Sequence, residues 1–347
     1  MLAALLFFVA APVRAIEEPE QAAIEEAPTE SQALAMVNEA YEKAGKLLKE
    51  GEVEAAIQVL NDTADKITMF PQATELRLQT LWLLVGRFMA TGEGQKATEK
   101  LLADLVGQAL PEHRDAVCVV AAQVYMMMAN YDAARETAQT YLKQYPPPTK
   151  EELEAFRKER FTMGDPAEPD PALKHPRILA RTALKDLLDR LAFIGKEAPQ
   201  FELETLDGQK VSPADFKGRI LIIDFWATWC QPCVDALPGL KATYEEQHAK
   251  GLEILGLSLD EDKDRLAAFV EKEKIPWKQV YLGEKGNELG KLYGFEGSIP
   301  AIFLIDRAGM VRGMDLRGQV LKLQVAKLMK QEATPPPPGA SIAEPQP

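Results

Sequence analysis

The sequence contains few of the residues that build metal sites and disulfide-rich scaffolds. Only three cysteines and three histidines occur among its 347 residues. That scarcity excludes a disulfide-dense fold, and a zinc site made of two cysteine pairs would lack its second pair. Lys and Arg are outnumbered, 40 against 53 Asp and Glu, which gives a net charge of −13. Because nucleic-acid binding needs clustered positive charge, we expect no nucleic-acid partner. The sequence predicts no metal and no cofactor.

The first residues lack the length of a membrane span. Met1 to Ala15 is apolar but too short to cross a bilayer as a helix. It ends in Val13-Arg14-Ala15 and resembles a secretory signal cleaved after Ala15, although the usual positive n-region is missing. A start upstream of Met1 and a short uncleaved anchor are the alternatives. We expect secretion across the cytoplasmic membrane and a periplasmic or otherwise extracytoplasmic location.

Three further segments have the composition of spacers. Residues 16–30 hold six glutamates, two prolines and no Lys or Arg, which predicts an acidic disordered spacer. Residues 162–193 combine a proline-rich linker with a connecting helix that opens at His175-Pro176. Residues 333–347 are proline-rich and predict a disordered tail.

Residues 31–161 predict a helical domain. Turn signals divide its first 115 residues into six helices arranged as three hairpins. These signals are at Gly51, Phe70-Pro71, Gly92-Glu93-Gly94, Leu110-Pro111 and Asn130. Small residues recur at Ala56, Ala97 and Ala134, about 40 residues apart, where paired helices would approach closely. The pattern resembles a tetratricopeptide-type repeat, but its spacing exceeds the usual 34 residues, and an unrelated helical bundle is an equal alternative. A charged helix follows at Lys150 to Arg160.

Several residues of this domain are typical of a buried core. The Met126-Met127-Met128 run and Trp82 favour core packing over a cofactor site. Cys118 lies within an apolar run, which predicts a buried, inert thiol.

The stretch from Ile220 to Pro238 predicts a reactive dithiol. It begins as a continuous apolar run, typical of a strand buried on both faces, and reaches Cys230 and Cys233. Pro232 suits the first turn of a helix, so Cys230 is expected at a helix N-terminus, which favours a thiolate. Cys233 lies one helical turn further on, where it can form a disulfide with Cys230.

This stretch resembles the active site of the thioredoxin superfamily. The sequence Phe225-Trp226-Ala227-Thr228-Trp229-Cys230-Gln231-Pro232-Cys233 is most similar to the TlpA-like (ResA-like) branch of extracytoplasmic disulfide reductases. About 70 residues later, Gly297 to Asp306 resembles the segment with the family's cis-proline. The resemblance covers roughly Ile194 to Lys330. It implies that Pro300 is the cis-proline, that Ile299 pairs with the backbone of an extended substrate, and that Trp229 and Pro232 border the substrate groove.

The resemblance also implies a proton acceptor for the second cysteine. Asp224 lies six residues before Cys230, where thioredoxins carry an aspartate in that role. TlpA-like proteins more often have asparagine there and a glutamate three residues after the second cysteine. Here that later residue is Ala236, with Asp235 before it on another helix face. We therefore expect Asp224 to accept the proton, since a buried carboxylate has a raised pKa; the alternative is a satisfied strand-end carboxylate.

The remaining pattern predicts a multidomain α and α/β protein, with N-terminal helical hairpins and a thioredoxin-like domain over residues 194–332. That domain should open with a hairpin at residues 201–211 and contain a central mixed sheet. The expected strands are 220–227, 252–259, 277–282, 301–305 and 311–317, and the expected helices are 232–250, 262–274 and 319–331.

Together these features predict an extracytoplasmic thiol-disulfide oxidoreductase that reduces protein disulfides. Its partners would be disulfide-containing clients, a thiol electron donor that could be membrane-bound, and a protein bound by the helical domain. Alternatives are a helical-repeat adaptor with a redox-sensing module and a peroxiredoxin-like thiol peroxidase. The peroxidase is disfavoured because Ile223 and Ala227 stand where its proline and threonine would be. Copper delivery is disfavoured because the nearest histidine, His248, lies at the far end of the active-site helix.

Overall fold

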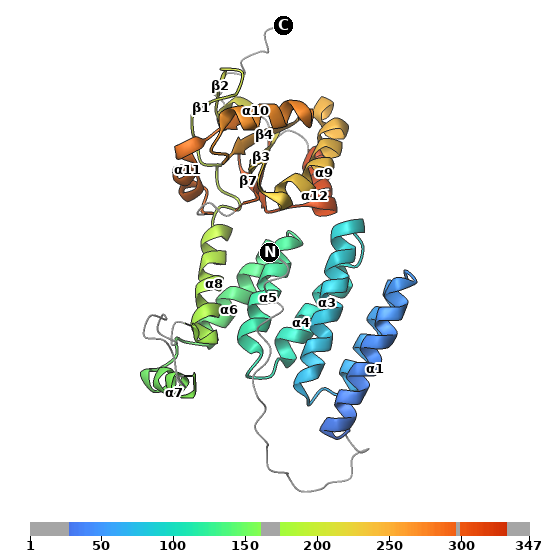
Figure 1. The fold of residues 1–347 in the computed structure, drawn as a ribbon. Coiled ribbons are helices and arrows are strands. Elements are labelled where there is room, and N and C mark those ends of the chain that lie inside the picture. The colour runs from blue at the N-terminus through green and yellow to red at the C-terminus, as the bar shows by residue number, and fades with distance from the viewer. Residues whose placement is uncertain (1–27, 161–173, 296–298, 332–347) are drawn as a thin grey trace.

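The computed structural model describes residues 28–160, 174–295 and 299–331. The predicted signal peptide, most of the acidic spacer, the proline-rich part of the linker and the C-terminal tail lie outside these residues. A layer of helices lies beside an α/β domain (Figure 1). None of the helices within the described ranges is both long enough and apolar enough to cross a membrane.

The described residues before Ile194 form eight helices. They are α1 Glu30–Lys49, α2 Val53–Lys66, α3 Pro71–Thr91, α4 Gln95–Gln108, α5 Arg114–Met127, α6 Tyr131–Gln144, α7 Lys150–Arg160 and α8 Pro176–Leu191. Successive helices from α1 to α6 pack on each other, which confirms the predicted six helices. Their ends follow the local chemistry: Thr29 forms a capping box with Gln32, and Gly92 ends α3 in the left-handed region. The tetratricopeptide interpretation stays a prediction.

The predicted register of the small residues is wrong by one position in the middle hairpin. The fourth residue of α2, α4 and α6 is fully buried in each case, and these residues are Ala56, Thr98 and Ala134. Ala97 is exposed instead. The glycine before α4 delays the start of that helix, because Gly94 has a φ of 88° and serves as its N-cap. Thr98 therefore takes the packing position.

Helix α8 belongs to the helical layer and leads into the redox domain. It packs on α5 and α6. Two residues beyond its end, Phe193 stacks edge-on against Phe303 of the sheet, with ring centroids 6.4 Å apart. The connecting helix thus contacts both parts of the chain.

The α/β domain contains a short hairpin and a five-stranded mixed sheet, as predicted. The hairpin pairs β1 Leu203–Glu204 with β2 Lys210–Val211. The sheet has the order β5-β4-β3-β6-β7, with β3 Ile220–Trp226, β4 Leu252–Ser258, β5 Lys278–Tyr281, β6 Ala301–Ile305 and β7 Val311–Met314. Strands β3, β4 and β5 run parallel, whereas β6 and β7 are antiparallel to their neighbours.

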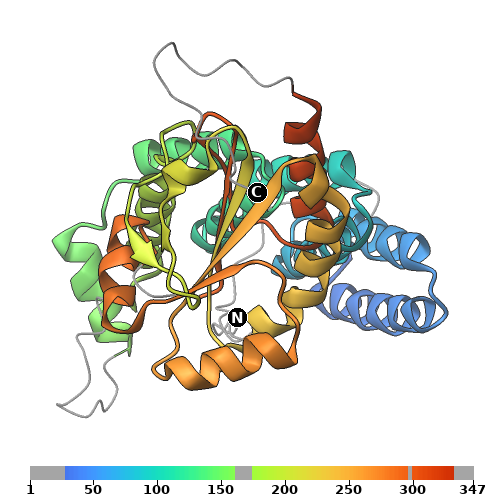
Figure 2. The same ribbon diagram turned by 90° about the horizontal axis from the view of Figure 1, so that it is seen from above.

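Four α-helices complete this domain (Figure 2). They are α9 Gln231–Gln247, α10 Lys263–Lys272, α11 Gly286–Leu292 and α12 Gly318–Lys330. Short 3-10 turns cover Pro213–Phe216, His248–Lys250 and Gly283–Lys285. Helix α11 was not predicted, because it is only seven residues long and two of these are glycines, which have low helix propensity.

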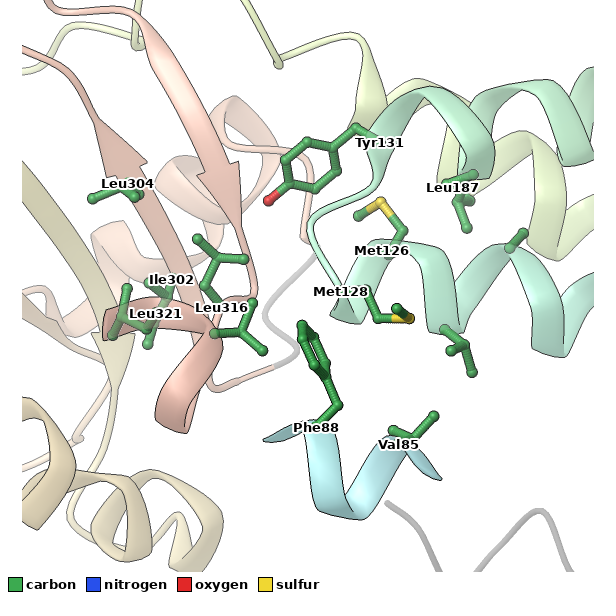
Figure 3. Packing of buried hydrophobic residues seen from close by; sticks show 14 of the residues in the cluster. Val85, Phe88, Met126, Met128, Tyr131, Leu187, Ile302, Leu304, Leu316 and Leu321 are labelled. Atoms are coloured by element: carbon green, nitrogen blue, oxygen red, sulfur yellow. The ribbon is translucent and has the colours of Figure 1, made fainter. Parts of the chain in front are cut away.

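The two faces of the sheet are buried in different cores. Side chains alternate along a strand, so Ile222 and Trp226 of β3 share one face, and Ile223 and Phe225 share the other. The Phe225 face packs within the domain, under the 193–201 segment and α11. The Trp226 face belongs to a core that continues into helices α3 to α6 and α8. Figure 3 shows this continuity: Phe88 and Met128 approach Leu316 and Leu321 of the α/β domain.

Candidate active site

Strand β3 delivers the two cysteines to the start of α9. All seven residues of β3 are buried, which fixes the strand in the centre of the sheet. Cys230 is the N-cap of α9, and Cys230 and Cys233 form a disulfide with their Cα atoms 5.3 Å apart. The Cys233 amide donates to Cys230 Sγ at 3.3 Å. A sulfur in this position faces the unpaired amides of the helix, which stabilise a thiolate after reduction.

The surroundings of the disulfide are unequally exposed. Cys230 is 5% exposed, whereas the neighbouring Trp229 is 56% exposed, and Pro232 lies on the surface. An indole so open to solvent presents an apolar surface beside the disulfide. Trp229 and Pro232 are thus exposed next to Cys230, and their part in substrate binding stays a prediction.

The predicted cis-proline lies at the same end of the sheet. The Ile299–Pro300 peptide bond is cis. Pro300 immediately precedes β6, whose first residue Ala301 is opposite Phe225 of β3. Ile299 and Pro300 are half-buried. Gly297 and Ser298 of the motif lie outside the described residues. The sheet thus brings the proline segment next to the strand that ends at the cysteines.

Asp224 lies within β3 on the same face as Trp226. Its side chain is 4% exposed, and its neighbours across the sheet are Gly256 of β4 and Ile302 of β6. Burial raises the pKa of this carboxyl to about 7, against a smaller lowering effect of the Arg317 charge. Such a group exchanges protons near neutral pH. The role of Asp224 as proton acceptor of Cys233 stays a prediction, and its burial and raised pKa are what favour it.

The other acidic candidate is placed differently. Asp235 is exposed and accepts a hydrogen bond from Gln231 Nε2 at 2.7 Å. Ala236 has no polar side chain. The described part of α9 therefore offers no buried carboxylate one turn after Cys233, and Asp224 is the remaining candidate.

Sequence reasoning missed a buried carboxylate that holds the loop before Cys230. Asp260 is 1% exposed and accepts from the amide of Thr228 at 3.0 Å and from its hydroxyl at 2.6 Å. Ser258 Oγ donates to the same carboxylate at 2.7 Å. The signal was available in principle: Asp260 follows β4, and the ends of the parallel strands β3 and β4 meet at one edge.

A second missed residue lies over Gly256. Gln279 of β5 reaches across this glycine, so that a Cβ on Gly256 would lie 2.1 Å from Gln279 Oε1. That oxygen accepts from the indole nitrogen of Trp226 at 3.0 Å. Gly256 is required because a larger residue would displace the carboxamide that orients Trp226.

Cys118 differs from the two active-site cysteines because it is a buried, unpaired thiol. It is buried in α5 of the helical domain and forms no disulfide. Burial, with the charge of Asp115 as a further cause, raises its pKa to about 11. Its burial confirms the expected core position, as do those of Met126 and Met128. In the described ranges, no three His, Cys, Asp or Glu side chains gather as metal ligands would.

Comparisons with known proteins agree with this geometry. Residues 194–314 match the AhpC/TSA family. The thiol-disulfide oxidoreductase ResA of Bacillus thuringiensis subsp. konkukian is 36% identical over 138 residues, which cover 40% of this chain and 78% of that protein. The chain belongs to the ResA-like thiol-disulfide oxidoreductases. ResA of Geobacillus thermodenitrificans is 31% identical over 119 residues, 34% of this chain and 67% of the relative.

One solved structure is similar to part of this chain. It is the thioredoxin domain of a thiol-disulfide oxidoreductase from Bacteroides vulgatus, with 32% identity and a TM-score of 0.38, covering 40% of this chain and 98% of that domain. The similarity to ResA makes this chain a thiol-disulfide oxidoreductase. The residues before Ile194 lie outside the segment that matches the AhpC/TSA family.

Proposed function

We propose that this ResA-like protein reduces disulfides of protein clients outside the cytoplasm, with its Cys-Gln-Pro-Cys site as the reactive centre. One observation carries the proposal. The Cys230–Cys233 disulfide lies at the start of α9, directly after the strand that buries Asp224 and at the same end of the sheet as Pro300. A thiolate at a helix N-terminus, a resolving thiol one turn away and a carboxyl that titrates near neutrality are the groups that dithiol exchange needs.

The reaction starts from the reduced dithiol. The Cys230 thiolate attacks one sulfur of a client disulfide, that disulfide breaks, and the client's other sulfur leaves as a thiolate that takes up a proton. Asp224 accepts the proton of Cys233, and the Cys233 thiolate attacks Cys230 in the mixed disulfide. The client then leaves with two thiols, and Cys230 and Cys233 are oxidised to a disulfide. A thiol electron donor returns two electrons.

Four residues around the cysteines would bind the client. The exposed indole of Trp229 and the surface-lying Pro232 offer apolar contact beside Cys230. Ile299 and Pro300 would align an extended client segment through their backbone groups. This role rests on the position of the two residues directly before β6, whose first residue Ala301 is opposite Phe225 near the end of β3.

The helical domain would bind a protein partner. Helices α1 and α2 lie at the end of the helical layer away from the α/β domain and share a separate core with the start of α3 (Figure 1). Leu34 and Leu48 of α1 and Met69 after α2 remain exposed. A helical layer with an end free of the redox domain can hold a client or an electron donor without blocking Cys230.

The reduction potential of the Cys230–Cys233 pair tests the proposal. Equilibration of the full chain with dithiothreitol or glutathione buffers gives the fraction of disulfide at each ratio. A potential near the −270 mV of thioredoxin, in round terms, supports a reductase, and one near roughly −120 mV would make the protein a disulfide donor. Replacing Cys233 by serine should trap clients as mixed disulfides on Cys230, and Cys230→Ser should trap none by this route.

A further inference from the structure

The connection between β7 and α12 lies between the two domains. This connection, residues 314–318, begins at the last residue of β7 and ends at the first residue of α12. Its second residue, Asp315, has a φ of 53°, a left-handed backbone that is uncommon for a residue other than glycine. The connection therefore has one defined conformation that its neighbours must hold.

The helical domain holds the connection from one side. Tyr131, the first residue of α6, is buried, and its hydroxyl accepts from the amide of Met314 at 2.9 Å. Arg190 of α8 forms an ion pair with Asp315. Leu316 is fully buried in the core shared by both domains, where Figure 3 shows it opposite Phe88.

The close approach continues at the start of α12. A Cβ on Gly318 would lie 3.0 Å from the carbonyl oxygen of Met89 in α3, and one on Gly92 would lie 3.1 Å from Leu323. Two glycines thus let α12 pack directly on the end of α3. The connection cannot shift without moving against the helical domain.

On the other side, the same connection contacts the redox site. The amide of Asp315 donates to the carbonyl of Ile302 at 2.8 Å. Arg317 Nη2 donates to the carbonyl oxygen of the cis-proline, Pro300, at 3.0 Å. A guanidinium on this oxygen fixes the peptide plane between Pro300 and Ala301, where the chain enters β6 beside the end of β3.

We propose that Arg317 is a positioning residue of the redox site, and that the helical domain holds it in place through Tyr131 and Arg190. The inference rests on the proposed function. Its consequence is that the helical domain does more than bind partners: it supports the cis-proline segment against which a client would lie. The charge of Arg317 also acts on Asp224, whose carboxyl it helps to ionise.

Few other charged groups act on the pKa of Asp224. Of the charged side chains in the described ranges, Arg317 is the one whose field lowers the pKa of Asp224. The groups nearest to Asp224 from the surrounding elements are uncharged: Gly256 of β4, Ile302 of β6, Trp226 of β3 and Gln279, which extends from β5 over Gly256. The dithiol of α9 is the other titratable pair at this site. Loss of the Arg317 charge should therefore raise the pKa of Asp224.

The first test replaces Arg317 in the full chain. The readout is the pH dependence of the release of client thiols from the mixed disulfide, followed by stopped flow. Arg317→Gln should move the apparent pKa of this step upward by about half a unit or more, so that the rate at pH 7 falls about twofold and the rate at pH 6 about threefold. Arg317→Lys keeps the charge and should recover most of the shift. Arg312→Gln is the matched control, because Arg312 is an exposed residue of β7 bound to Asp306.

The second test weakens the hold of the helical domain. Tyr131→Phe keeps the ring in the core and removes only the hydroxyl that binds Met314, and Tyr125→Phe in α5 is its control. Tyr131→Phe should shift the pH profile in the same direction as Arg317→Gln, by a smaller amount. The double variant should shift it no further than Arg317→Gln alone, because both act through one connection.

The outcomes separate this inference from the proposed function. If the wild-type chain reduces no client and matches Cys230→Ser, both are wrong. If the wild-type chain is active and Arg317→Gln keeps its pH profile, only the role of Arg317 is wrong. Additive shifts of Tyr131→Phe and Arg317→Gln would overturn the part of the helical domain. Should Arg317→Gln fail to fold by circular dichroism, Tyr131→Phe still tests the proposal, and a wild-type pH profile for Tyr131→Phe would then overturn it.

Discussion

Replacing Asp224 by asparagine should make the protein more stable at alkaline pH and slower as a reductase. The substitution keeps the shape of the side chain and removes the charge. In the native state the carboxyl is buried, and its pKa is raised to about 7 from the ordinary 3.8. In the unfolded chain the carboxyl is hydrated and has its ordinary pKa. The native state therefore binds the proton of Asp224 more tightly than the unfolded state.

The sign of the pH effect follows from this difference. Between about pH 4 and pH 7 the native protein holds a proton that the unfolded chain has lost, so the free energy of unfolding falls as the pH rises. The stability that the neutral carboxyl retains below pH 4 is lost as the pH passes through the native pKa. The native and unfolded pKa values of Asp224 differ by about three units, which corresponds to a loss of at most roughly 4 kcal/mol in the free energy of unfolding. Asparagine does not titrate and avoids this loss.

Urea unfolding of the oxidised protein at pH 4, 6 and 8 measures the effect. Wild type and Asp224→Asn should have similar stability at pH 4, and the variant should gain progressively up to pH 8. Asp264→Asn, at an exposed position, should run parallel to wild type. Parallel curves for Asp224→Asn as well would refute the reasoning, because they would mean an ordinary pKa for Asp224. In the reduction assay the variant should lose about a hundredfold in the resolving step at neutral pH, the usual contribution of a general base.

Three further predictions concern other parts of the chain. Cys118, whose pKa is raised to about 11, should carry about one thiolate in a thousand molecules at pH 8; iodoacetamide should label the reduced dithiol first in mass spectra, and early labelling of Cys118 would contradict its burial. Asp260→Asn should lower the free energy of unfolding by about 2 kcal/mol and slow reduction, because it leaves hydrogen bonds of Thr228 and Ser258 unsatisfied. Glu261→Gln, at the exposed neighbouring residue, serves as the control. An equal urea midpoint for the two variants would argue against a stabilising role of the Asp260 hydrogen bonds. Gly318→Ala should cost about 1 to 2 kcal/mol more than Gly195→Ala. Both glycines have positive φ, but only at Gly318 would the added Cβ meet another backbone, 3.0 Å from the carbonyl oxygen of Met89. Equal thermal shifts would show that the domain contact is not tight.

The sequence predicted those features that depend on neighbours along the chain. The apolar run of β3 requires burial on both faces, and the cysteines and Pro232 at its end define the start of α9. The turn residues divided the helical domain correctly, because glycine, proline and asparagine act on the backbone locally. The cis bond before Pro300 came from the resemblance alone and is confirmed.

The features that escaped prediction depend on contacts between distant segments. Asp260 follows β4, Gln279 belongs to β5 and Arg317 precedes α12, so only the folded domain brings these distant segments together near the end of β3. The apolar periodicity of a segment predicts that a side chain is buried, but it does not predict in which domain the side chain is buried. Leu316 is such a case, because its partner Phe88 is more than two hundred residues away.

The shared core decides how the two domains behave together. Interfaces between domains of one chain are commonly polar and allow relative motion. Here Leu316 and Leu321 are buried against the helical layer, and Gly318 brings α12 against the backbone of α3. Separating the domains would expose these leucines to water at about 25 cal/mol for each Å² of apolar surface, and would also leave Arg190 and Asp315 unpaired. Domain separation is therefore unfavourable, and the helical domain keeps a fixed position relative to Cys230. If it binds a partner as proposed, it delivers that partner at a constant distance from the dithiol, so that the length and flexibility of the partner decide which of its disulfides can reach Cys230.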